Sequence, residues 1–374
     1  MVSQFWNPVR ITFGPRSFER LPELLAPLSA QRIALIGDAH LLGELGLRER
    51  IRSLLPDRQL SIFDGFSPNP QVAEAQAAVR FVRDSGADVV LGIGGGSALD
   101  VAKVAAAVAT IDHDLAALLA SRQPVVEPGL PTVLVPTTAG TGSEVTRWAT
   151  LWDHEAKRKH SLEGPGMYPT HALLDPELTL TLPPPLAAVT GADALSHAME
   201  AYWNRGANAI SDVYALEAVR RIFESLPMVV LNPDRLEYRT DLLFASLLAG
   251  LAFSNTKTAA AHSLSYPMTL HFGVAHGQAT SITLPALLKY NAEASLDRMT
   301  QLAKAIGGNS IDSGARRIQV LLQRIGLKTT LADLGIDAEG IELCVREGYT
   351  PDRAGNNLRE LDADGMREIL RMVA

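Results

Sequence analysis

The chain has 374 residues, of which 47% are hydrophobic, 20% charged and 6% aromatic, and its formal net charge is −7. These values are typical of a globular protein and exclude a disordered or repetitive one, and the length predicts two domains. The charge is spread without a basic block, so we do not expect nucleic acid as a partner.

In the first half of the chain, short β-branched runs alternate with helical patterns. The predicted strands are RIALIG (32–37), DVVLGIG (88–94) and TVLVPTT (132–138), with a helix after the first and another from Ser97. This alternation is typical of a parallel sheet with crossover helices. RWATLWD (147–153) and the run after KRKHSL (157–162) could add a hairpin.

The triplet Pro183, Pro184 and Pro185 interrupts the chain. Three consecutive residues without N–H donors cannot lie inside a helix or a central strand, so we place the domain boundary there. The prediction is an α/β Rossmann-like nucleotide-binding domain over residues 1–183 and an all-α helical domain over 184–374, where apolar residues recur at helical spacing. We expect the active site in the cleft between the two domains.

A glycine triplet in LGIGGGSALDVAK (91–103) is the first candidate site. Gly94, Gly95 and Gly96 let the backbone approach a pyrophosphate, and the helix that starts near Ser97 offers free N–H groups. The spacing differs from the standard G-x-G-x-x-G turn, so a simple tight turn between strand and helix is an equal alternative.

Two further features favour a dinucleotide. The loop VPTTAGTGSEVT (135–146) carries hydroxyls that could reach a cofactor, although such runs are often only solvated loops; these hydroxyls belong to Thr137, Thr138, Thr141 and Thr146. Asp38 follows the first strand, where a carboxylate binds ribose hydroxyls and repels a 2′-phosphate, which favours NAD(H) over NADP(H). A helix cap is the alternative for Asp38.

Four residues in two segments predict a metal site. Asp193 and His197 are four residues apart on a helical segment, which places both side chains on one face. His262 and His276 follow in the segment 261–285. Each histidine alone would be ordinary, but three imidazoles and a carboxylate suit Fe²⁺ or Zn²⁺.

Together these motifs resemble the iron-containing, or group III, alcohol dehydrogenases, which have the dehydroquinate synthase-like fold. The resemblance covers nearly the whole chain, through NPVRITFG, GGGSALDVAK, PTTAGTGSEVT, GADALSHAMEAY, the His262 to His276 segment and NNLREL. It implies an NAD(P)-dependent dehydrogenase that acts mainly as an aldehyde reductase.

The resemblance also implies site residues. The metal ligands fall on Asp193, His197, His262 and His276. The NAD contacts fall on Asp38, Asn69, Gly95, Gly96, Ser97, Thr138, Thr141, Thr146, Lys159 and Leu186, and we add Gly94, Asp100 and Thr137 from the same motifs.

One position departs from the family pattern. Many members have a histidine four residues after the third ligand, credited with proton relay, and here that residue is Tyr266. Its unperturbed pKa near 10 makes tyrosine a poor acid at neutral pH. Tyr266 and His271 are the two catalytic candidates for proton transfer, and an exposed loop position is the alternative for His271.

The run HSLSYPMT, the opening WNPVRITFG and TRWATLWD resemble a branch of the family found with phosphonate metabolism. That branch reduces phosphonoacetaldehyde to 2-hydroxyethylphosphonate. An anionic substrate requires a cation, and the candidates are Arg147, Lys159, His160 and Arg353. Sulfoacetaldehyde, succinic semialdehyde and simple aliphatic aldehydes are alternative substrates, and a dehydroquinate synthase-like lyase or a non-catalytic NAD-binding protein are rival functions.

The location follows from what the sequence lacks. Its single cysteine, Cys344, forms no internal disulfide, which fits a reducing compartment. No apolar stretch predicts a signal peptide or a membrane span. We therefore expect a cytoplasmic protein with a small-molecule substrate and no membrane partner, assembled as a homodimer or larger homo-oligomer.

Overall fold

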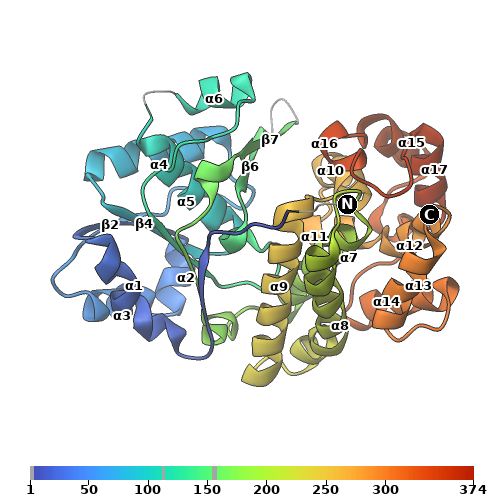
Figure 1. Cartoon of the computed structure of the whole chain (residues 1–374), viewed down its shortest axis with the longest axis horizontal. Coiled ribbons are helices and arrows are strands. Elements are labelled where there is room, and N and C mark those ends of the chain that lie inside the picture. Colours follow the sequence, from blue (N-terminus) through green and yellow to red (C-terminus); the bar gives the residue numbers. More distant parts are fainter. Residues whose placement is uncertain (1–3, 112–113, 154–157) are drawn as a thin grey trace. The chain divides into compact units, whose positions relative to one another are not determined.

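The computed structural model describes residues 4–111, 114–153 and 158–374 and is traced in Figure 1. The chain divides into two compact units. The α/β unit consists of Pro8–Thr138 and Gly142–Thr181, and the helical unit consists of Met1–Asn7, Ala139–Thr141 and Leu182–Ala374. The sequence does not predict that two short segments from the first half belong with the helical unit.

A six-stranded parallel sheet forms the centre of the α/β unit. Its strands are β1 (Arg10–Phe13), β2 (Arg32–Gly37), β3 (Gln59–Phe63), β4 (Val89–Gly94), β5 (Thr132–Pro136) and β8 (His171–Leu174). Their order in space is β1-β8-β5-β4-β2-β3, and every neighbouring pair is parallel. The three strands expected from the sequence are β2, β4 and β5, and the predicted fold class is confirmed.

Helices cover both faces of this sheet, because alternate side chains of a strand point to opposite sides. Ile33 and Leu35 of β2 pack into one core, whereas Ala34 and Ile36 pack into another. The helices of this unit are α1 (Leu21–Leu25), α2 (Ala39–Glu44), α3 (Leu47–Leu54), α4 (Val72–Ser85), α5 (Gly96–Ala109) and α6 (Leu115–Ser121). Burial on both faces explains why the central strands are continuous apolar runs.

An antiparallel hairpin of β6 (Trp148–Asp153) and β7 (Arg158–Glu163) completes the α/β unit. The prediction for the second strand was wrong, because β7 lies within the KRKHSL segment rather than after it; residue 157 of that segment lies outside the described residues. Leu162 is the single apolar side chain that β7 buries, in a core that it shares with α4 and α5. One apolar residue among charged ones gives too weak an alternation to predict a strand.

The main segment of the helical unit begins at Leu182, immediately before the proline triplet. Its helices are α7 (Pro184–Trp203), α8 (Ala209–Leu231), α9 (Leu236–Thr256), α10 (Ala260–Phe272), α11 (His276–Ser281), α12 (Leu284–Ala292), α13 (Leu296–Ala305), α14 (Ile311–Arg324), α15 (Ala338–Glu347), α16 (Pro351–Ala354) and α17 (Ala363–Arg371). Pro184 and Pro185 occupy the first turn of α7, where no N–H is needed. None of the described helices is both long enough and apolar enough to cross a bilayer.

The start of the chain packs against helices that are far away in the sequence. The ring of Phe5 lies 5.4 Å from the ring of Tyr214 on α8. The N–H of Trp6 donates a 2.9 Å hydrogen bond to the Asn255 side chain on α9. These contacts tie the N-terminal segment to the helical unit.

Candidate metal and nucleotide sites

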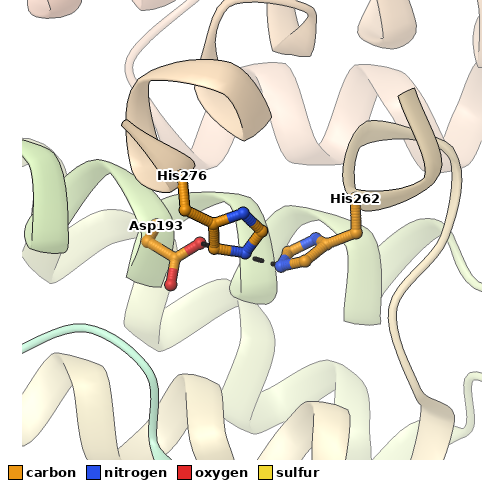
Figure 2. A group of neighbouring side chains, drawn as sticks. All are labelled: Asp193, His262 and His276. Atoms are coloured by element: carbon orange, nitrogen blue, oxygen red, sulfur yellow. Dashed lines mark ion pairs between the residues drawn. The ribbon is translucent and has the colours of Figure 1, made fainter. Parts of the chain in front are cut away.

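Three helices bring the predicted metal ligands into one cluster within the helical unit. Asp193 and His197 lie one turn apart on α7 and are only 4% and 6% exposed. His262 lies in the first turn of α10, and His276 is the first residue of α11. Gly273 ends α10 at a φ of 66°, which is favourable for glycine and turns the chain toward α11. Figure 2 shows Asp193, His262 and His276 facing one another.

The distances in this cluster suit a single cation. Nε2 of His262 lies 3.7 Å from Oδ1 of Asp193, and Nε2 of His276 lies 3.8 Å from the same oxygen. The three ligand atoms all lie within 4.8 Å of one another. Two atoms that each lie about 2.1 Å from one ion are at most about 4.2 Å apart, so little movement is needed for all three to bind it.

His197 lies beside this group of three rather than within it. Its ring stacks on Phe253, with 4.1 Å between the ring centroids. Its Nε2 is 3.0 Å from Nε2 of His262, and its Nδ1 is 3.8 Å from Oδ2 of Asp193. Two imidazole nitrogens at this distance require a shared proton or a shared cation. The role of His197 as a fourth ligand therefore stays a prediction.

Sequence reasoning missed Glu200, which lies behind His262. Glu200 is fully buried on α7, and its Oε1 accepts hydrogen bonds from the N–H groups of Ala261 (2.6 Å) and His262 (3.2 Å). Its Oε2 contacts Nδ1 of His262. Burial raises the pKa of the Glu200 carboxyl to about 7, although the backbone donors oppose this shift. The only signal in the sequence was a carboxylate one turn after His197 on an apolar helix.

The glycine triplet forms the turn between β4 and α5 in the α/β unit. Gly94 has a φ of 147°, and a Cβ there would lie 2.7 Å from the Cβ of Ala98. Gly95 precedes the first turn of α5, which has no side chain capping it. Gly96 begins this 14-residue helix. The open N–H groups and the positive end of the helix dipole suit a phosphate.

Three other predicted nucleotide contacts lie near the β4–α5 turn or at the end of β2. Asn69 has a φ of 57°, and its N–H donates a 3.2 Å hydrogen bond to the Ser97 hydroxyl. Asp38 caps α2, because its Oδ1 accepts a 2.8 Å hydrogen bond from the N–H of Leu41. Asp38 is exposed, so capping leaves its second oxygen accessible. Thr138 lies next to Gly95, since a Cβ on that glycine would be 3.4 Å from its methyl group.

Three other predicted cofactor residues are buried or hydrogen-bonded within the α/β unit. The Asp100 carboxylate accepts hydrogen bonds from the Ser143 hydroxyl (2.6 Å) and the Thr150 N–H (2.7 Å). The Thr146 hydroxyl, which is 1% exposed, accepts from Lys103 and donates to the carbonyl of Ser143. Thr137 is buried as well. These three residues hold the polar loop in shape. Thr141 belongs to the helical unit.

Lys103 was also missed, and it organises this loop. Its ammonium is buried and donates to the carbonyls of Ser143 (3.1 Å) and Trp148, and it lies 3.2 Å from Oδ1 of Asp100. Burial lowers the pKa of Lys103, whereas Asp100 and Glu144 oppose that shift. Burial raises the pKa of Glu144 to about 7. The lysine ends the GGGSALDVAK motif, which was the available signal.

The remaining residues are the two catalytic candidates and two further predicted cofactor contacts. Tyr266 lies one turn after His262, and its ring is nearly parallel to that of His276, with 6.5 Å between centroids. His271 bonds instead to the Glu347 carboxylate at 2.7 Å. The remaining two are Lys159, whose Nζ lies 5.6 Å above the Trp152 ring, and Leu186, which is 47% exposed in the first turn of α7.

Two family models together match nearly all of the chain. Residues 8–176 match the iron-containing alcohol dehydrogenases, and residues 187–374 match the C-terminal part of the Fe-containing alcohol dehydrogenase family. The chain belongs to the iron-containing alcohol dehydrogenase family. The family resemblance inferred from the motifs is thus confirmed, and this alcohol dehydrogenase is an oxidoreductase.

Several relatives of this alcohol dehydrogenase match it over almost their full length. Long-chain-alcohol dehydrogenase 1 of Geobacillus thermodenitrificans (strain NG80-2) is 35% identical over 95% of this chain and 94% of its own. The 1,3-propanediol dehydrogenase of Citrobacter freundii is 30% identical over 96% of this chain and 95% of its own. The crystal structure of sulfoacetaldehyde reductase from Bifidobacterium kashiwanohense in complex with NAD⁺ superposes with a TM-score of 0.95 at 33% identity, covering 100% of this chain and 99% of that one.

Proposed function

We propose that this alcohol dehydrogenase is a metal-dependent, NAD(H)-linked reductase of small aldehydes that carry an anionic group. Phosphonoacetaldehyde, reduced to 2-hydroxyethylphosphonate, is the first candidate substrate, and sulfoacetaldehyde is the second. The cluster of buried Asp193 and His262 with half-buried His276 carries the proposal of a metal centre. The dehydrogenase relatives favour hydride transfer over a lyase reaction or a non-catalytic role.

The donor set of the cluster fits Fe²⁺ or Zn²⁺. Asp193, His262 and His276, with His197 as the fourth ligand, would supply three imidazoles and one carboxylate, a combination that transition metals accept and that Ca²⁺ and Mg²⁺ do not favour. The cation would polarise the aldehyde oxygen and NADH would supply the hydride. The protein's own contribution is to hold the ligands in place within a buried site.

The cofactor residues that we propose lie mainly around the β4–α5 turn. Gly94, Gly95, Gly96, Ser97 and Asn69 would bind the pyrophosphate, and Asp38 would bind the adenosine ribose and disfavour the 2′-phosphate of NADPH. Thr138, Thr141, Lys159 and Leu186 are the further contacts proposed. Thr137, Asp100 and Thr146 would contribute by shaping the loop.

For proton transfer we favour Tyr266 over His271. Tyr266 lies next to the ring of His276, whereas His271 is engaged by Glu347. The Tyr266 hydroxyl would deliver a proton to the substrate oxygen and recover it from water. Tyr266→Phe should lower kcat more than KM, and His271→Gln should change neither by more than about twofold.

Recognition of an anionic aldehyde would require a cation. Nε of Arg147 is buried without a hydrogen-bond partner among the described residues, and this supports Arg147 as the residue that binds the phosphonate or sulfonate. Arg147→Gln should raise KM for anionic aldehydes and leave KM for propionaldehyde unchanged. An equal rise for both substrate classes would show that Arg147 has only a structural role.

The decisive experiment is anaerobic reconstitution of the metal-free protein with Fe²⁺ or Zn²⁺. Oxidation of NADH and NADPH would then be followed with phosphonoacetaldehyde, sulfoacetaldehyde, succinic semialdehyde and uncharged aldehydes. We expect turnover only with metal, a preference for NADH and the highest kcat/KM on the first two substrates. Preference for uncharged aldehydes would overturn the substrate assignment.

A pair of histidine variants tests the metal centre itself. His262→Ala should abolish both metal binding and turnover, because it removes a buried ligand. His40→Ala is the matched control, since His40 is exposed on α2 and pairs with Glu44 one turn away. An active, metal-free His262→Ala enzyme would refute the metal-dependent scheme.

A further inference from the structure

Glu200 is enclosed by groups that fix the role of each of its two oxygens. It is fully buried on α7, three residues after His197 and seven after Asp193, so all three side chains project from the same face of the helix. Its Oε1 accepts from two backbone N–H groups in the first turn of α10. A backbone N–H can only donate, so Oε1 must act as the acceptor, and these two bonds define the orientation of the carboxylate.

The second oxygen then determines where the proton of His262 lies. Oε2 contacts Nδ1 of His262, and an ionised carboxylate can only accept a hydrogen bond. Nδ1 must therefore carry the proton of the neutral imidazole. Nε2 keeps its lone pair and is directed toward the other ligand atoms, 3.7 Å from Oδ1 of Asp193 and 3.0 Å from Nε2 of His197.

We propose that Glu200 is a positioning residue that holds His262 as the Nδ1–H tautomer with Nε2 open for a cation, while capping α10 so that the ring cannot turn away. The inference rests on the proposed metal centre and assigns a role to a residue outside its ligand set. Hydrogen bonds to the distal nitrogen of a ligating histidine generally fix its orientation and raise its basicity. Here the same carboxylate also ties the helix that carries Asp193 to the helix that carries His262.

Glu200→Gln gives a sharp test because the backbone N–H groups dictate the orientation of the new amide. The amide oxygen must stay on the two N–H donors, so the NH₂ group meets Nδ1 of His262. Nδ1 then becomes the acceptor, the proton moves to Nε2, and that nitrogen cannot bind a metal. We expect the affinity for Zn²⁺, measured by competition with a chromophoric chelator, to fall roughly 10–100-fold.

The tautomer can be observed without metal or turnover. In metal-free protein with ¹⁵N-labelled histidine, the His262 signals should report Nδ1–H in the native protein and Nε2–H in Glu200→Gln. Glu200→Asp keeps the charge and should retain the Nδ1–H tautomer with intermediate affinity for Zn²⁺. Glu144→Gln, a change at another fully buried glutamate, should leave Zn²⁺ affinity unchanged.

The outcomes separate this inference from the metal centre on which it rests. If the native protein binds no Zn²⁺ or Fe²⁺, the proposed function fails. If the native protein binds metal and Glu200→Gln binds it equally well, or if the native His262 is the Nε2–H tautomer, the role of Glu200 fails. If Glu200→Gln does not fold, a Glu200→Asp protein with the Nε2–H tautomer would overturn the inference equally.

Discussion

Gly277 has no room for a side chain, and a single methyl group there should displace its neighbour His276, one of the proposed metal ligands. The residue follows His276 in α11, which packs against α7. A Cβ on Gly277 would lie well inside contact distance of the carbonyl oxygen of Val189, and 2.9 Å from its carbonyl carbon. Val189 belongs to the backbone of α7, so its carbonyl group cannot rotate away.

The required movement follows from these distances. Ordinary contacts of a Cβ begin at 3.4 Å, so the carbonyl carbon alone requires a shift of about 0.5 Å, from 2.9 to 3.4 Å, and the oxygen requires more. Metal–ligand distances tolerate only about 0.2 Å. Gly277→Ala should therefore weaken Zn²⁺ binding by about tenfold or more and lower the free energy of unfolding by about 1–3 kcal/mol, the usual cost of overpacking.

Chelator competition and urea unfolding would measure these two effects. Gly43→Ala is the matched control, because nothing lies within 4 Å of its added Cβ on α2. It should leave Zn²⁺ affinity unchanged and stabilise the protein by up to about 1 kcal/mol. Native Zn²⁺ affinity in Gly277→Ala would refute the reasoning that α11 is held against α7 at this glycine.

Three further predictions concern the α/β unit. Burial and the charge of Arg10 lower the pKa of His171 in the folded protein, so the unfolded chain takes up a proton first as the pH falls through about 6.5. The stability to urea should therefore be complete above that pH and decline below it. His171→Leu should flatten this decline. Lys103→Met should lower the free energy of unfolding in urea by about 3–5 kcal/mol, because it leaves buried acceptors unpaired. The exposed control Lys289→Met should lower it by less than about 1 kcal/mol. Equal losses in the two variants would contradict this view. Asp38→Asn should raise kcat/KM with NADPH relative to NADH while keeping the helix cap; an unchanged ratio would remove Asp38 from the cofactor site.

The central elements of the fold were predictable because burial on both sides leaves continuous apolar runs in β2, β4 and β5. The edge strand β1 and its neighbour β8 have four residues each, and β1 begins with a charged, exposed arginine. Such short strands are defined by their partners rather than by their own pattern. The same reasoning explains why the KRKHSL segment was not identified as a strand.

The proximity of Asp193, His262 and His276 was predictable in outline because helical spacing and residue chemistry act locally. Glu200 was not, since the N–H groups that bind it belong to residues more than sixty positions later. The hydrogen bond between Lys103 and Thr146 was unpredictable for the same reason. In the sequence, a threonine in a polar loop looks the same whether its hydroxyl faces solvent or a buried ammonium. Pairings between distant residues are set by tertiary packing, and one sequence contains no direct record of them.

The first residues of the chain have a consequence for biosynthesis. Phe5 and Trp6 are made well before Tyr214 and Asn255, which they contact; 249 positions separate Trp6 from Asn255. During synthesis the Phe5 ring and the Trp6 N–H therefore remain without these partners while the α/β unit is completed. Domains generally fold as units from the N-terminus during translation. Until α8 and α9 are made, the nascent α/β unit would thus be joined to an unpaired Phe5 side chain that chaperones can bind.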